Sequence, residues 1–161
     1  VPIVVTSALD GAPELSARLL DLWATLPEAA RKRPFVVVGH GPGNDEHAKT
    51  WVTDLTRAAS VVAEHENIPF KVGLLRDDAP PPVRAAAVNE IRRTIEEFAG
   101  PAGDSVTVLP ILISSGSINN VKIPQDLAGL PIRYQPMALA PSPHLARWIE
   151  RVALARLESI H

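Results

Sequence analysis

Short apolar segments alternate along the chain with longer amphipathic ones. The apolar segments are nearly continuous or rich in β-branched residues, which is typical of strands covered on both faces. They predict five strands, over residues 3–6, 35–39, 70–75, 106–113 and 132–135.

Apolar residues at helical spacing follow the first three strands. They predict helices over residues 15–26, 48–62 and 83–98, a short helix over 124–128 and a last one over about 143–157. Asn44 or Asp45 stands where the second helix needs an N-cap. Strands that alternate with helices predict an α/β fold with three α/β/α layers, in which helices cover both faces of a parallel sheet of four to five strands.

The two ends of the chain resemble each other. The segments PIVVTSALDGAPELSARLL and PIRYQPMALAPSPHLARWI share Pro-Ile, Ala-Leu and Pro-x-Leu steps in the same order. Either two proline-capped strand–helix units share a common pattern, or a domain has been duplicated. We favour duplication, in which residues 1–34 end a preceding repeat and residues 35–161 form one α/β domain.

Composition narrows the possible functions. The length of 161 residues suits one compact domain, and a net charge of −2 offers no electrostatic basis for binding nucleic acid or an acidic membrane. The absence of cysteine excludes disulfides, thiolate metal sites and cysteine nucleophiles. No apolar run approaches the about 18 residues of a membrane span, and the start does not read as a secretory signal. We expect a cytoplasmic protein without nucleic-acid or membrane partners.

Polar residues collect after the predicted strands, where open parallel sheets bind ligands. The four loops are residues 39–47, 76–79, 114–120 and 137–143, the last followed by His144. His40 is the main candidate because glycines on both sides allow a sharp turn and the close approach of a ligand. A neutral imidazole there could bind a divalent metal ion or accept a proton. The alternative is a structural histidine bonded to a loop carbonyl.

Other residues admit two interpretations each. His47, in the first turn of a helix, is either a second metal ligand or an exposed residue. Asp77 and Asp78 either orient a metal ion or an imidazolium, or cap the next helix. The segment GPGND lacks the lysine and spacing of a phosphate-binding loop, and no G-x-S-x-G elbow is present. A small-molecule hydrolase using His40 with Asp78 stays an alternative.

Three segments resemble a known family. VVVGHGPGNDEHAKTW resembles the opening motif of the CbiX-type sirohydrochlorin cobaltochelatases, members of the class II chelatase group. LPILISSGSINNVKIPQDL is similar to their later segment, and LRDDAPPPVRAAAV stands where they carry their second strand-to-helix loop. The resemblance covers residues 35–151 and implies insertion of Co²⁺, or in relatives Fe²⁺ or Ni²⁺, into a sirohydrochlorin-type tetrapyrrole in cobalamin or siroheme biosynthesis.

The resemblance also implies roles for single residues. It makes His40, the family's first histidine by position, the catalytic and metal-binding residue, and it implies that no nucleotide is needed. From its place in the first turn of the next helix, His47 is the further candidate metal ligand. It makes the macrocycle the substrate and implies a partner that is another chelatase-like repeat or subunit, with a homodimer as one form. The residues expected to bind the macrocycle are Arg76, Asp78, Ser115 and Lys122, with Arg133 as a further cation.

Two positions differ from the family pattern. Ile118 stands where the family has its second metal-binding histidine, and Lys122 stands where it has an acidic residue before Ile-Pro. Isoleucine cannot bind a metal ion, and lysine reverses the charge. The alternative function is therefore a degenerate repeat that binds metal or tetrapyrrole without turnover, or supports a partner domain.

Overall fold

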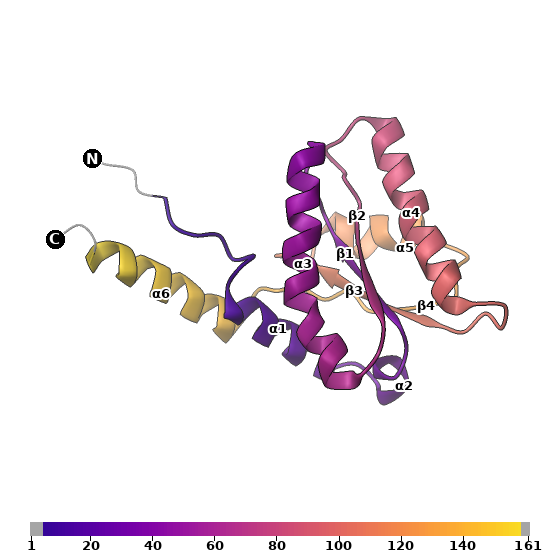
Figure 1. The fold of residues 1–161 in the computed structure, drawn as a ribbon, viewed down its shortest axis with the longest axis horizontal. Coiled ribbons are helices and arrows are strands. Elements are labelled where there is room, and N and C mark those ends of the chain that lie inside the picture. The colour runs from indigo at the N-terminus through magenta and orange to yellow at the C-terminus, as the bar shows by residue number, and fades with distance from the viewer. Residues whose placement is uncertain (1–4, 159–161) are drawn as a thin grey trace.

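A parallel sheet forms the centre of the computed structural model, which describes residues 5–158 (Figure 1). Its four strands lie in the order β2-β1-β3-β4, and every pair is parallel. The strands are β1 (Phe35–Gly39), β2 (Phe70–Leu74), β3 (Val106–Ile111) and β4 (Ile132–Tyr134). The α/β fold with a parallel sheet is confirmed.

A fifth strand is not part of the described sheet. Val5 and Thr6 are irregular, and Val5 is 79% exposed. The other two residues of the strand predicted over 3–6 lie outside the described part. A strand needs a hydrogen-bonded neighbour, and the described part of this segment has none in the sheet.

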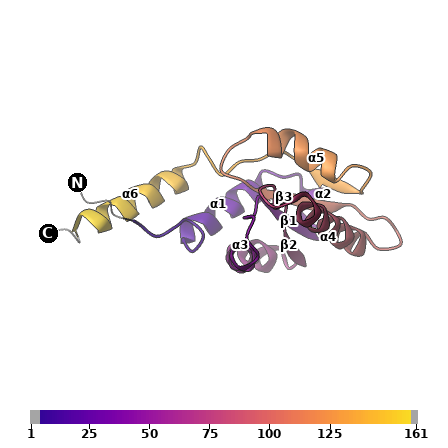
Figure 2. The same ribbon diagram turned by 90° about the horizontal axis from the view of Figure 1, so that it is seen from above.

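Helices cover both faces of the sheet and give the three layers that were predicted. On one face lie α1 (Pro13–Ala24), α2 (Glu28–Arg31) and α3 (Asp45–Glu66). On the other lie α4 (Pro81–Ala99), the π-helix η1 (Ile118–Lys122) and α5 (Ile123–Asp126). The last helix, α6 (Pro143–Glu158), packs beside α1 and extends away from the sheet (Figure 2).

The central strand β1 shows why its sequence is continuously apolar. Phe35 and Val37 point into the core beneath α1 and α3, while Val36 and Val38 point into the core beneath α4 and α5. All four side chains are at most 1% exposed. Since both faces of β1 are buried, a polar side chain within the strand would be buried as well, and polar residues begin only after the strand ends.

The start of α3 is fixed by its cap. The side-chain oxygen of Asn44 accepts hydrogen bonds from the backbone N–H groups of Glu46 and His47, at 2.9 and 3.1 Å. The N-cap prediction is confirmed for Asn44, and the cap sets where the loop after β1 becomes helical. Among residues 5–158, no helix is both long and apolar enough to cross a membrane.

Candidate functional site

His40 directly follows β1, at the edge of the sheet where all four strands end. Its side chain is 29% exposed, and Nδ1 lies 3.0 Å from the carbonyl oxygen of Gly41. A carbonyl oxygen only accepts hydrogen bonds, so the neutral ring carries its proton on Nδ1. The lone pair is then on Nε2, which can bind a metal ion or take a proton.

The glycines beside His40 are packed closely against side chains of β2 and α3. Gly41 has φ of +74°, and a Cβ atom there would lie 2.7 Å from Cβ of Leu74. A Cβ atom on Gly39 would lie 2.9 Å from Cδ1 of Leu55. The sharp turn predicted from these glycines is present at Gly41, and close packing against Leu74 and Leu55 is a further reason for them. The expected approach of a ligand stays a prediction.

Two hollows adjoin His40. The first, about 340 Å³, lies between the N-terminal segment, α3 and the end of β3, and its walls include Leu9, Trp51 and Ile113. The second, about 410 Å³, lies against the loop after β3 and includes Ser114 and Ile118. Since His40 contributes to both linings, it stands between two mainly apolar surfaces.

Asp78 approaches the same histidine from the loop after β2. Its Oδ2 lies 3.8 Å from Nδ1 of His40, and its side chain is 74% exposed. This carboxylate is therefore placed to stabilise a protonated imidazole. The expectation that Asp78 is near His40 agrees with this geometry, whereas its expected role towards a macrocycle stays a prediction.

Asp77 has a different role from its neighbour. Burial raises the pKa of Asp77, but hydrogen bonds from Lys122 and Arg84 outweigh burial and leave that pKa below its ordinary value. Arg84 also pairs with Asp126 at 2.7 Å, and together these hydrogen bonds raise the pKa of Arg84. The network ties the loop after β2 to η1 and α5, and Lys122 is part of it.

Arg76 holds the histidine loop. It pairs with Asp45 at 2.6 Å and donates to the backbone carbonyls of Pro42 and Gly43, at 3.2 and 2.7 Å. Its side chain is only 14% exposed. Arg76, which was expected to bind the macrocycle, is therefore bonded to the segment between His40 and α3.

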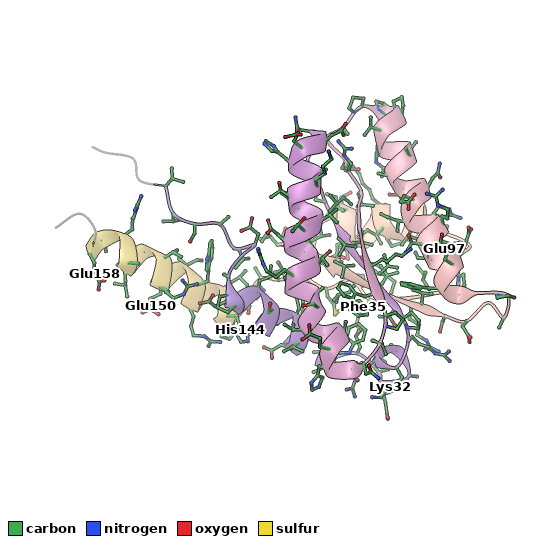
Figure 3. All side chains as sticks on the ribbon, viewed as in Figure 1. Lys32, Phe35, Glu97, His144, Glu150 and Glu158 are labelled. Carbon is green, nitrogen blue, oxygen red and sulfur yellow. The ribbon has the colours of Figure 1, made fainter. Side chains whose placement is uncertain are left out.

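The remaining candidates lie apart from one another. His47 is exposed in the first turn of α3, and Ser115 is exposed and accepts a hydrogen bond from Asn120 at 3.3 Å. His144 lies where α6 meets α1 (Figure 3) and bonds Asp21 at 2.8 Å. Across residues 5–158, no group of three or more His, Asp or Glu side chains is arranged to hold a metal ion.

Trp51 and Ile113 are the site residues that sequence reasoning missed. Both line the first hollow, and they are 42% and 58% exposed. Trp51 falls in the helix predicted over 48–62, and Ile113 falls in the strand predicted over 106–113. The strand ends at Ile111 instead, and the start of α3 borders the hollow. The spacing of apolar residues does not record either feature.

Comparison of the chain with models of known protein families and with curated protein sequences gives no significant match. The fold and the site geometry define the chain as a three-layer α/β/α protein with a histidine-centred hollow at the carboxyl edge of its sheet.

Proposed function

We propose that this chain is a CbiX-like chelatase domain that inserts a divalent metal ion, in the first place Co²⁺, into a tetrapyrrole ring. The observation that carries the proposal is the position of His40. It follows the central strand, adjoins two mainly apolar hollows, and has Nδ1 committed to the Gly41 carbonyl, which leaves Nε2 for chemistry.

Metal insertion releases two protons from the pyrrole nitrogens for each divalent ion that enters. Nε2 of His40 can bind the incoming ion with water in its other coordination positions, or accept one of the two protons. Asp78 stands beside the ring that would become positively charged. If His40 accepts one proton, the other leaves to solvent; if His40 binds the ion, both protons leave to solvent.

The walls of the first hollow support a planar ring as the second substrate. Trp51 and Ile113 are large, exposed and apolar, and both adjoin the lining that contains His40. Aromatic side chains bind flat conjugated molecules by offset stacking. A ring against Trp51 and Ile113 would bring its nitrogens towards the histidine side of the hollow.

The test is the rate of cobalt insertion followed by absorbance. The metal-free chain is mixed with Co²⁺ and either sirohydrochlorin or mesoporphyrin, and His40→Ala is compared with His65→Ala, an exposed histidine on α3. We expect acceleration of at least one ring that His40→Ala abolishes and His65→Ala retains. Rates equal to the uncatalysed reaction with both rings would overturn the proposal.

A second candidate is a repeat that binds a tetrapyrrole without turnover. Ile118 favours it, because this isoleucine lines the second hollow together with His40. An apolar side chain therefore occupies a position beside His40 where the resembling family has a metal-binding histidine. Ring binding without acceleration in the same assay would select this candidate.

The face of α6 supports a role beside a second α/β unit. Counted from their initial prolines, α1 and α6 carry apolar residues at equivalent positions, yet Leu19 is buried and its equivalent Ile149 is 57% exposed. Leu154 and Leu157 are also exposed, at 53% and 58%. We propose that α6 packs on another unit of this fold as α1 packs on this one. Sedimentation of the chain, with Ile149→Glu for comparison, tests for self-association.

A further inference from the structure

Among the described residues that line the two hollows beside His40, none is a lysine or an arginine. The first contains Asp10 and Asp54 among apolar residues, and the second contains the hydroxyl groups of Ser114 and Ser117. Among the described lining residues, His40 alone can carry a positive charge. A polyanionic ligand would meet Asp10 and Asp54 in the first hollow, and no lysine or arginine in the described lining of either hollow.

The cations of the surrounding loops are bound to carboxylates of the same chain. These groups are Arg57 with Asp54, Arg76 with Asp45, Lys122 with Asp77, and Arg84 with Asp77 and Asp126. The cost of moving a cation to a ligand is largest at Asp77, whose carboxylate is 8% exposed and would lose Arg84 or Lys122.

Two carboxylates near the hollows are not neutralised in this way. Within residues 5–158, neither Asp10 nor Asp78 forms an ion pair with lysine or arginine. Arg18, which lies near the lining residue Leu139, donates to the backbone carbonyls of Ala138 and Leu139, at 2.9 and 3.0 Å. Arg18 keeps its positive charge, but its guanidinium is bonded to these carbonyls and is not part of either described lining. The described linings themselves therefore offer an anion no guanidinium or ammonium group.

We infer that the ring accepted beside His40 is an apolar tetrapyrrole with few carboxylates, rather than the polycarboxylate ring of the family that the sequence resembles. The inference rests on the proposed function, because it concerns the same hollows. The apolar edge of such a ring lies against Trp51 and Ile113, and its few polar groups face the hydroxyl groups of Ser114 and Ser117.

The test is a fluorescence titration of the chain with three metal-free rings: the dicarboxylate mesoporphyrin, the tetracarboxylate coproporphyrin and the octacarboxylate uroporphyrin. We expect mesoporphyrin to bind at least about tenfold more tightly than uroporphyrin, because each added carboxylate meets like charge. Asp10 lies in an exposed loop, and Asp10→Lys replaces its negative charge by a positive one. We expect this variant to bind uroporphyrin more tightly, so that the difference between its affinities for mesoporphyrin and uroporphyrin becomes smaller.

Matched variants separate a site from adsorption. Ile113→Asp places a charge in the lining, and Val52→Asp places one at an exposed position on α3 that lines neither hollow. We expect mesoporphyrin binding to be lost in the first variant and kept in the second. If both variants lost mesoporphyrin binding equally, the ring would be adsorbing to the protein surface without a specific site, and the inference would be overturned.

The remaining outcomes separate the inference from the proposed function. If uroporphyrin bound as tightly as mesoporphyrin and Ile113→Asp abolished binding of both, the inference on charge would be wrong and a tetrapyrrole site would stand. If none of the three rings bound the chain, the inference would be overturned, and the cobalt assay with sirohydrochlorin would decide the proposed function.

Discussion

Oδ2 of Asp78 lies 3.8 Å from Nδ1 of His40, so two loops that follow different strands meet at one ring nitrogen. The same nitrogen lies 3.0 Å from the carbonyl oxygen of Gly41. The carbonyl selects the tautomer of the neutral ring, and the carboxylate approaches the same nitrogen from a second loop. Asp78 is therefore a positioning residue for His40.

Asp78→Asn should lower the rate of metal insertion modestly, by about two- to fivefold, because a carboxylate exposed to this extent interacts through water. The difference from the unmodified chain should shrink as salt is added. Asp104→Asn, which removes an exposed carboxylate paired with Arg33, is the control and should leave the rate unchanged. An unchanged rate for Asp78→Asn at low salt would contradict this role.

Gly41→Ala should destabilise the fold by about 2–3 kcal/mol, since alanine is strained at this φ and its Cβ would overlap Leu74. The measurement is the free energy of unfolding in urea. Gly116→Ala is the matched control, because a Cβ atom there meets open space in the loop after β3. Equal losses in the two variants would show that the turn at Gly41 carries no special strain.

The layers could be predicted because burial leaves a periodic record in the sequence. β1 is apolar at every position since Phe35 and Val36 enter opposite cores, and Asn44 caps α3 through a local hydrogen bond. His40 could be placed at the sheet edge for the same reason, because the residue after a buried strand in a parallel sheet lies where ligands bind.

The partners of the charged residues could not be predicted. Lys122 pairs with Asp77 across more than forty residues of sequence, and Arg76 turns to Asp45 and the glycine loop. Such pairs depend on how loops meet in three dimensions, which neither periodicity nor spacing records. The resemblance to the chelatases and the roles that it implies stay predictions.

Glu66, at the end of α3, joins three helical segments. Its carboxylate accepts hydrogen bonds from Lys32 at 3.0 Å and from Trp23 Nε1 at 3.2 Å, and its side chain is 5% exposed. The hydrogen bond from Lys32, opposed by burial, holds the pKa of Glu66 below its ordinary value of 4.5. The ionised carboxylate therefore stabilises the fold above that value, and the contribution is lost as pH falls through the lowered pKa.

Glu66→Gln should reduce the free energy of unfolding by about 1–3 kcal/mol at neutral pH, because it removes the charge that Lys32 and Trp23 bond. The loss should shrink in acid, where the carboxylate of the unmodified chain is protonated as well. Urea unfolding at neutral and acidic pH measures both values, with the exposed Glu64→Gln as control. A loss of the same size at both pH values would contradict the ionic contribution.

Ile118→His should give the chain a second imidazole in the hollow that already contains His40. Because two imidazoles can bind one ion, we expect the Kd for Co²⁺ to fall by at least about tenfold, measured by calorimetry on the metal-free chain. Val121→His adds a histidine to the same π-helix at a position that is 45% exposed, and should leave the Kd unchanged. The gain should also vanish when His40→Ala is combined with Ile118→His. If the gain persisted without His40, or appeared equally in Val121→His, the two positions would not share one metal site.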